Sequence, residues 1–244
     1  MSGFRSAAAA LLLGVASTLL LHPALAQPVT YINNIAPFVY TENNVQQGVV
    51  HELVHLLAKR RGYDGAILAT PLKRRVAQLG AQSDTFGVIW RQPDNETDFT
   101  WLFKLLDDQV VLMTTSDSKA DISSVASAKN LRIGVILGSP AETMARRLGF
   151  AHIEPISNVE SNASKMQVKR IDAWLGLASV AAYAGHAGNG SVKFRRGPVV
   201  GTASLYFACG RRCDQSEARK WTEAYNGMKA DGTLAAVLAK YHFH

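Results

Sequence analysis

The sequence is poor in cysteine and contains no long apolar run after residues 1–26. Its only two cysteines, Cys209 and Cys213, form a Cys-x-x-x-Cys pair with no histidine close by in the sequence. Such a pair is weak evidence for a metal site, so in an exported protein we expect a disulfide. The shortage of apolar runs argues against a membrane-spanning helix in the remainder of the chain, and we expect a soluble protein.

Residues 1–26 have the pattern of a secretory signal peptide. Arg5 supplies the positive charge, residues 7–21 form the apolar run, and Ala24-Leu25-Ala26 is a small-x-small cleavage site before Gln27. A single arginine rather than a pair favours ordinary secretion over the twin-arginine route. No cysteine stands at the cleavage site to carry a lipid. These features predict a free protein in a bacterial periplasm.

The composition excludes a disordered chain and gives a basic protein. Hydrophobic residues make up 48% of the sequence, and the formal net charge is +7. The basic clusters are spread along the chain and are Lys59-Arg60-Arg61, Lys73-Arg74-Arg75, Arg195-Arg196 and Arg211-Arg212. A basic surface is the simpler interpretation of this spread, and a preference for anionic ligands or partners is the alternative. The predicted export argues against nucleic acid as a partner.

His51-Glu52-x-x-His55 matches a zinc-peptidase pattern, in which two imidazoles hold the metal and the glutamate acts as general base. A third ligand is missing, because Arg61 stands where the long motif needs histidine and no glutamate follows at the required spacing. The periodicity predicts a helix over residues 47–61 whose apolar stripe faces away from the motif. We interpret the match as chance, and we expect no metal, no cofactor and no enzymatic activity.

Strand and helix patterns alternate along the chain. The expected strands cover residues 29–33, 66–69, 85–90, 131–136, 153–156, 173–177 and 203–209, with further extended segments at 35–40, 99–106 and 109–114. The expected helices cover residues 47–61, 72–79, 141–148, 161–169, 180–184, 215–231 and 234–241. Such alternation predicts an α/β fold with a largely parallel sheet.

Four segments carry a resemblance to a known family. They are Ala36-Pro37-Phe38 with the helix up to Gly62, the loop Arg91-Gln92-Pro93-Asp94-x-Glu96-x-x-Phe99, the strand and turn at residues 128–138, and the helix pair at residues 229–241. In this order they resemble the corresponding segments of the family 3 extracellular solute-binding proteins, the two-lobed periplasmic receptors that feed ABC importers. The likeness extends over residues 29–241.

The resemblance implies a two-lobed fold of the type II periplasmic-binding-protein class, each lobe a mixed, mostly parallel sheet flanked by helices. Lobe one would comprise residues 27–106 and 203–244, and lobe two residues 107–202, with crossings near Leu106 and Gly201. Ligand would bind between the lobes, which close around it by hinge motion. General physics agrees, because loops at the carboxyl ends of strands carry ligands in open α/β sheets.

In amino-acid receptors of this family an arginine pairs with the ligand carboxylate, an aspartate holds its ammonium group, and an aromatic ring stacks on it. The matching positions in this sequence are Asn95, Leu177 and Ile35. A guanidinium suits a carboxylate and a carboxylate suits an ammonium, so their loss argues against a standard α-amino acid. We expect a small polar or anionic organic solute instead.

Other residues are candidates for the cleft. Gly138 and Ser139 precede a helix, so their backbone N–H groups and the serine hydroxyl are placed to hold an anionic group. Trp90 and Arg91 end a strand and offer a flat apolar wall and a charge. Phe38 and Tyr40 offer further aromatic area, and for each of them a position in the core is as good an interpretation as a contact with the ligand. The full set of predicted ligand-binding residues is Phe38, Tyr40, Trp90, Arg91, Asn95, Gly138, Ser139 and Leu177.

These features predict a monomeric periplasmic solute-binding protein that delivers its solute to the permease subunits of an ABC-type importer. Two alternatives stay open. One is a periplasmic enzyme similar to the cyclohexadienyl dehydratases, for which Glu52, Glu142 and Glu160 are the candidate acids or bases. The other is an orphan receptor that presents its ligand to a membrane sensor.

Overall fold

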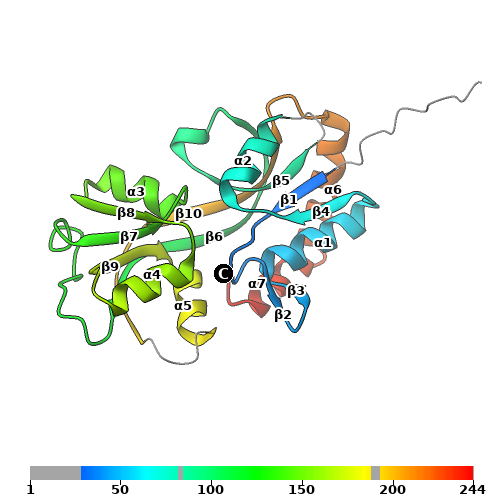
Figure 1. Cartoon of the computed structure of the whole chain (residues 1–244). Coiled ribbons are helices and arrows are strands. Elements are labelled where there is room, and N and C mark those ends of the chain that lie inside the picture. Colours follow the sequence, from blue (N-terminus) through cyan, green and yellow to red (C-terminus); the bar gives the residue numbers. More distant parts are fainter. Residues whose placement is uncertain (1–28, 82–84, 188–192, 244) are drawn as a thin grey trace, which may run out of the picture.

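The computed structural model describes residues 29–81, 85–187 and 193–243. The predicted signal peptide at residues 1–26 lies outside the described residues, as do residues 188–190 of the glycine-rich segment. The described chain forms an eight-stranded mixed sheet in the order β4-β1-β5-β10-β6-β9-β7-β8, with helices on both faces (Figure 1). The strands are β1 Val29–Ile32, β4 Ala66–Ala69, β5 Phe86–Arg91, β6 Phe99–Thr115, β7 Arg132–Ile136, β8 His152–Ile156, β9 Ala173–Leu177 and β10 Phe194–Gly210.

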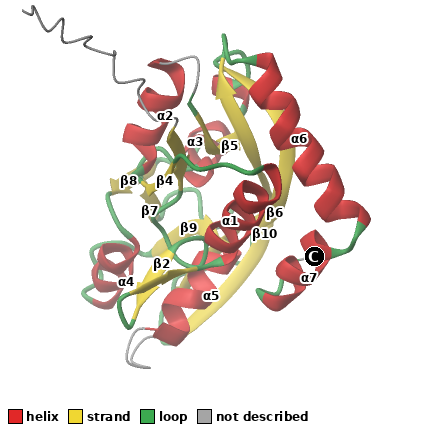
Figure 2. Ribbon diagram, turned by 90° about the vertical axis from the view of Figure 1, so that its right-hand side faces the viewer, coloured by secondary structure: helices red, strands yellow, loops and turns green. Residues whose placement is uncertain are grey.

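Two long antiparallel strands, β6 and β10, form the middle of the sheet and join its two halves. Their pairing extends from Phe194 opposite Thr115 to Gly210 opposite Phe99. Figure 2 shows them curving together along the molecule. The expectation of separate segments at 99–106 and 109–114 is wrong, and so is the start of the last strand at residue 203. The hydrogen bonds between β6 and β10 keep both strands extended through positions where the alternation of apolar residues is interrupted.

The first half of the molecule contains β1, β4 and β5, which are mutually parallel in the order β4-β1-β5. Its helices are α1 Val49–Arg61, α2 Leu72–Ala81, α6 Gln215–Ala230 and α7 Thr233–Lys240. Helix α1 buries the predicted apolar stripe, including Val50, Leu53 and Leu57. It ends at Gly62, whose left-handed conformation lets its N–H bond back to the last turn.

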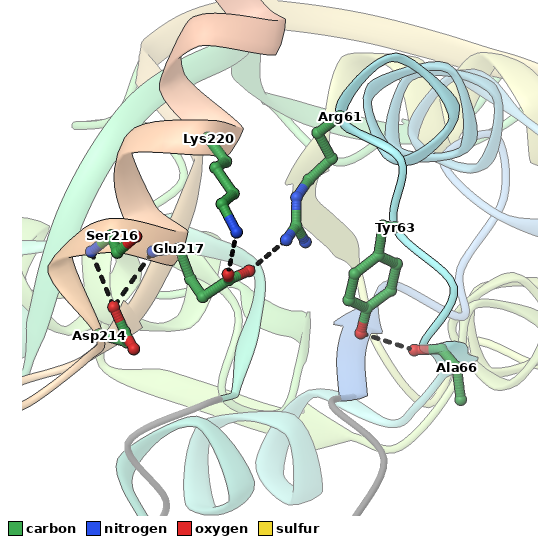
Figure 3. A network of polar contacts seen from close by, with 7 residues as sticks. All are labelled: Arg61, Tyr63, Ala66, Asp214, Ser216, Glu217 and Lys220. Atoms are coloured by element: carbon green, nitrogen blue, oxygen red, sulfur yellow. Dashed lines mark hydrogen bonds and ion pairs between the residues drawn. The ribbon is translucent and has the colours of Figure 1, made fainter.

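Helix α6 attaches the C-terminal part of the chain to α1 (Figure 3). The Arg61 guanidinium pairs with Glu217 of α6, and its Cζ lies 4.9 Å from the ring centre of Tyr63 and 4.5 Å from that of Trp221. The side chain of Asp214 caps α6 by accepting from the N–H groups of its first turn. Residues distant in sequence therefore complete one packed unit.

The second half contains β7, β8 and β9, with β7 parallel to both of its neighbours and β9 antiparallel to β6. Its helices are α3 Pro140–Leu148, α4 Val159–Gln167 and α5 Ala178–Ala187. Each follows one of these strands in sequence, as expected for βα units. The core continues through both halves, and Trp174 in β9 and Trp221 in α6 are fully buried.

The expected extended segment at residues 35–40 is wrong, because a turn occupies most of it. The Ile35 carbonyl accepts from the N–H of Phe38 at 2.9 Å, and the Phe38 carbonyl accepts from the N–H of Val50 at 3.0 Å. A hairpin of β2 Tyr40–Glu42 and β3 Val45–Gln47 stands where only a polar turn was expected. A Cβ on Gly48 would lie 2.4 Å from the Phe38 carbonyl oxygen, so this approach requires glycine.

The predicted disulfide between Cys209 and Cys213 is confirmed, with the two Cα atoms 5.7 Å apart. It joins the end of β10 to the segment before α6. Among the described residues, none of the helices has the length and apolar character needed to cross a membrane.

Candidate functional site

A cavity of about 1110 Å³ lies between the two halves and is lined by both. Its first-half lining consists of residues that follow β1 and β4, together with Trp90 near the end of β5. Its second-half lining consists of residues at the ends of β7 and β9 and residues that follow β7, β8 and β9. The strands of each half are parallel, so their carboxyl ends lie on one edge. Both edges face this cavity, which is where open α/β sheets bind ligands.

The first-half wall contains a buried guanidinium, that of Arg75 in α2. The residue is 1% exposed, and its Nη1 donates to the carbonyl oxygens of Ile32 at 3.1 Å and Thr70 at 2.9 Å. Its Nε–H has no acceptor among the described residues. The Oδ1 of Asn33, which is also buried in this wall, has no donor within the same part of the chain.

No carboxylate of the described chain forms an ion pair with Arg75. Burial lowers the pKa of Arg75 to about 9, so the group still carries its charge at neutral pH. Exposed Lys73, two residues earlier in α2, adds a second positive charge to the lining. Arg75 therefore gives this wall a positive charge that is not paired with any carboxylate of the described residues, whereas Lys73 acts electrostatically on Glu142.

Aromatic rings form much of the remaining surface. Trp90 lies on the first-half wall and packs edge-on against Phe38 at 5.4 Å. Tyr40 and Tyr183 come from opposite halves, and their ring centres approach to 4.9 Å. Trp174, on the second half, is fully buried, and its Nε1–H lacks an acceptor among the described residues.

The indole of Trp174 occupies the space that a side chain at position 176 would need. A Cβ added to Gly176 would lie 2.6 Å from the indole Nε1. Both residues line the cavity from β9, where side chains two positions apart share one face. Glycine at position 176 thus permits the orientation of Trp174.

The helix start on the second-half wall is already occupied by the protein itself. The Gly138 N–H donates to the Glu142 carboxylate at 2.6 Å, and the Ser139 N–H donates to the Ile136 carbonyl at 3.0 Å. The Ser139 hydroxyl caps α3 by accepting from the N–H of Glu142 at 3.3 Å. The expectation that the backbone N–H groups of Gly138 and Ser139 are open to a ligand is therefore wrong for this structure.

Glu142 is held as an anion by these contacts. Burial raises its pKa, but the hydrogen bonds from Arg146 and from the Gly138 N–H outweigh burial and lower the pKa below its ordinary value. The start of α4 is also capped by the protein itself, because the Asn158 side chain accepts from the Ser161 N–H at 2.8 Å. Glu160, in the first turn of α4, is exposed and lines the cavity.

Four of the predicted ligand-binding residues line the cavity, namely Tyr40, Trp90, Ser139 and Leu177. The other four, Phe38, Arg91, Asn95 and Gly138, are not part of the lining. Phe38 is fully buried between Trp90 and Phe243, in accord with its core interpretation.

Arg91 and Asn95 have structural contacts away from the cavity. Alternation along β5 separates Arg91 from Trp90, and the Arg91 Nε donates to Glu96 at 2.9 Å. The guanidinium also lies over Trp101 and Tyr206. Asn95 donates to the Trp90 carbonyl at 2.9 Å and accepts from the Gln92 N–H, which closes the 3-10 turn Pro93–Asn95.

Sequence reasoning missed the residues that leave polar atoms open, Arg75, Asn33 and Trp174. For Arg75 a signal existed, because the basic cluster at residues 73–75 follows a strand and opens a helix. We interpreted that cluster as surface charge. Asn33 follows the first strand directly, at the edge where such sheets bind ligands.

The His51 and His55 rings lie 4.0 Å apart on α1. The Nδ1 of His55 is 2.8 Å from the His51 carbonyl oxygen, and burial lowers the pKa of His51. The Glu52 carboxylate accepts from Lys240 at 2.6 Å and Tyr241 at 3.0 Å, which connects α1 to the end of the chain. The interpretation of the motif as a chance match stays a prediction.

No family model and no curated protein matches the sequence. The ligand-binding core of GluR0 from Nostoc punctiforme, in complex with (L)-glutamate, matches with a TM-score of 0.75 at 19% identity, over 87% of this chain and 98% of that one. A putative L-cystine ABC transporter from Listeria monocytogenes matches with a TM-score of 0.75 at 17% identity, over 88% of this chain and 96% of that one.

A third solved structure is that of AncCDT-1, described as an ancestral amino acid-binding protein and a precursor of cyclohexadienyl dehydratase. It matches with a TM-score of 0.73 at 19% identity, over 87% of this chain and 93% of that one. At such identities the likeness establishes the fold alone. The predicted α/β fold of the two-lobed periplasmic binding proteins is confirmed.

Proposed function

We propose that this protein is a periplasmic solute-binding protein that captures a small polar or anionic organic solute between two lobes and delivers it to an ABC-type importer. The observation that carries the proposal is the cavity of about 1110 Å³, on which the carboxyl ends of parallel strands from both halves converge. At about 1110 Å³ it lies slightly above the range of about 300–1,000 Å³ that is typical of small-molecule sites, so it has room for a small organic ligand.

The two halves would act as lobes, with residues 27–106 and 203–244 in one and residues 107–202 in the other. The proposed crossings, near Leu106 and Gly201, lie on β6 and β10. The rings of Tyr40 and Tyr183 would separate and meet again as the lobes open and close. Small-angle scattering with and without bound solute would measure that change in shape.

Solute binding is tested by native mass spectrometry of the purified protein, followed by thermal unfolding with candidate solutes. A bound small molecule that is released on denaturation would support the proposal. A solute present at 100 times its Kd should add about 2.7 kcal/mol to the free energy of unfolding. A chain that carries no small molecule and shows no shift with organic acids, sugars or amino acids would contradict it.

Delivery needs its own experiment, because a receptor for a membrane sensor would bind solute equally well. We expect loss of solute uptake when the gene is deleted, and recovery when it is restored. Unchanged uptake together with loss of a transcriptional response to the solute would favour the orphan receptor.

The dehydratase alternative now depends on a single carboxylate. Of the candidates Glu52, Glu142 and Glu160, only Glu160 lines the cavity, while the other two are engaged in hydrogen bonds. Incubation with prephenate or arogenate should give no product. Product formation that is lost in a Glu160→Gln variant would establish the enzyme instead.

A further inference from the structure

The unpaired guanidinium of Arg75 is the most specific chemical feature of the cavity. Burying a charge without a partner is costly, and native proteins keep such groups paired or use them in a site. Arg75 is 1% exposed, two backbone carbonyls hold its Nη1, and its Nε–H points to no acceptor in the described chain. The two carbonyls fix its orientation but leave the positive charge uncompensated.

The surroundings favour an anion at this place. The charged side chains of the lining are Lys73, Arg75 and Glu160, so positive charge is in excess. Helix α2 begins at Leu72 beside the cavity and adds the positive end of its dipole. On the opposite wall the start of α3 already holds the carboxylate of Glu142. A ligand anion therefore finds its open partner on the first half.

A carboxylate suits this guanidinium better than a bare halide, because the planar fork of arginine matches two oxygens. The buried Asn33 Oδ1, next in sequence to the Ile32 that Arg75 contacts, offers an acceptor for a ligand hydroxyl. Trp174 Nε1–H offers a donor from the other half. These groups would be satisfied by a ligand that carries a carboxylate and a few further polar atoms.

The rest of the ligand meets rings and aliphatic groups. Trp90, Tyr40 and Tyr183 line the cavity together with Ile35 and Leu177. A flat apolar body would fill this space by stacking. Position 177 carries no acidic group, and Glu160 is the one carboxylate in the lining set, so a ligand ammonium would find little compensation.

We propose that the cavity binds an organic monocarboxylate with a flat apolar body and no ammonium group, and that Arg75 holds its carboxylate. The proposal rests on the solute-binding function and adds the ligand class and the residue that selects it. It predicts that the carboxylate is recognised by the first half before the second half closes over the apolar body.

The test measures tryptophan fluorescence and calorimetric affinity for three flat aromatic carboxylates, benzoate, 4-hydroxybenzoate and phenylacetate. Each is paired with its neutral amide, and phenylalanine is the zwitterionic control. The wild-type protein should bind at least one carboxylate, its amide at least about tenfold more weakly, and phenylalanine more weakly still. Arg75→Met should weaken carboxylate binding about 100-fold and leave amide binding within a few fold.

Two further variants separate recognition from folding. Arg75→Lys keeps the charge but loses the fork, and it should recover part of the carboxylate affinity. Arg74→Met removes a neighbouring exposed charge that does not line the cavity, and it should change the affinity by less than about threefold. Unchanged amide binding by Arg75→Met shows that the cleft is intact, so its loss of carboxylate binding cannot be ascribed to misfolding.

Equal carboxylate affinity in wild type and Arg75→Met would overturn the assignment of Arg75 while leaving the solute-binding function in place. Binding of sugars or amino acids, with no binding of the three carboxylates, would overturn the ligand class and again leave that function in place. A protein that binds nothing in the panel and carries no small molecule after purification would overturn both.

Discussion

The two walls of the cavity treat their polar groups in opposite ways. On the first half, Arg75 and Asn33 are buried with atoms that no described residue satisfies. On the second half, Glu142 closes the start of α3, and Asn158 closes the start of α4. Polar groups that bond to each other make a wall rigid, but they leave no donor or acceptor for a ligand. The open groups on the other wall are the ones that can discriminate between solutes.

Trp174 is the exception on the second half, and substitution of Gly176 would test it most severely. In Gly176→Ala the new Cβ would press on the indole at 2.6 Å, so we expect a loss of about 2–3 kcal/mol in stability and a shift in tryptophan emission. Denaturant unfolding measures the first effect. Gly80→Ala in α2, where a Cβ would meet nothing within 4 Å, should be neutral or stabilising. Equal stability of the two variants would contradict this account of Trp174.

Asp108 extends the comparison to β6, where the halves meet. Burial raises its pKa to about 6 although Ser179 donates to it at 2.5 Å, so the ionised form is disfavoured in the folded protein. Its favourable contribution is complete below pH 4 and is lost as the pH rises from about 4 to about 6. Asp108→Asn should therefore raise stability at pH 7 by about 2 kcal/mol and show no such loss.

The neighbouring carboxylate is the matched control. Burial raises the pKa of Asp107, but hydrogen bonds from Lys104 and Ser204 outweigh burial and keep the pKa below normal. Its contribution is present above pH 4 and is lost as the pH falls through the folded pKa. Asp107→Asn should lower stability at pH 7. Thermal unfolding between pH 3 and pH 8 measures both variants, and curves of the same sign would refute the distinction.

Glu142→Gln would open the second wall. The neutral amide weakens the bonds to the Gly138 N–H and to Arg146, so we expect a loss of about 1 kcal/mol at pH 7. Because the folded pKa of Glu142 lies below its ordinary value, the difference from wild type should vanish as the pH falls through that folded pKa. A difference that persists at pH 2 in thermal unfolding would show that charge is not responsible.

Arg91→Ala should have the smallest effect on the cavity. The side chain pairs with Glu96 outside the lining, so solute affinity should change by less than about twofold. Titration with whichever solute the wild type binds measures this. A loss of solute affinity comparable to that of Arg75→Met would show that Arg91 belongs to the binding site, as predicted from the sequence.

The sequence predicted most helices and the parallel strands, because their apolar periodicity is uninterrupted. It did not reveal residues 194–202 of β10, where Arg195, Arg196 and exposed Val199 break any alternation. Only the pairing with β6 makes that stretch a strand. Strand register decided the site in the same way. Trp90 and Arg91 were predicted to face the cleft together, although neighbours on a strand point to opposite faces.

Arg75 shows the remaining limit. Three basic residues in a row open α2, and the pattern does not say which one turns inward. The choice depends on the carbonyls of Ile32 and Thr70, which come from two different strand ends. Such contacts arise only when the sheet has assembled, so they cannot be predicted from the sequence pattern around residues 73–75.

The paired course of β6 and β10 has a mechanical consequence. The two passages between the halves are hydrogen-bonded to one another, with Ala203 opposite Asp108 and Ser204 opposite Asp107. Together they form a two-stranded ribbon. Its hydrogen bonds oppose sliding of one strand along the other, whereas the ribbon can still twist and can bend out of its plane. In the proposed opening and closing of the lobes, such a ribbon would restrict the relative rotations of the two halves. The register between Val199 and Gly201 is irregular, and such irregularities increase the local twist of a strand pair. A substitution there would test whether the proposed opening of the lobes depends on this twist, without changing a side chain of the cavity lining.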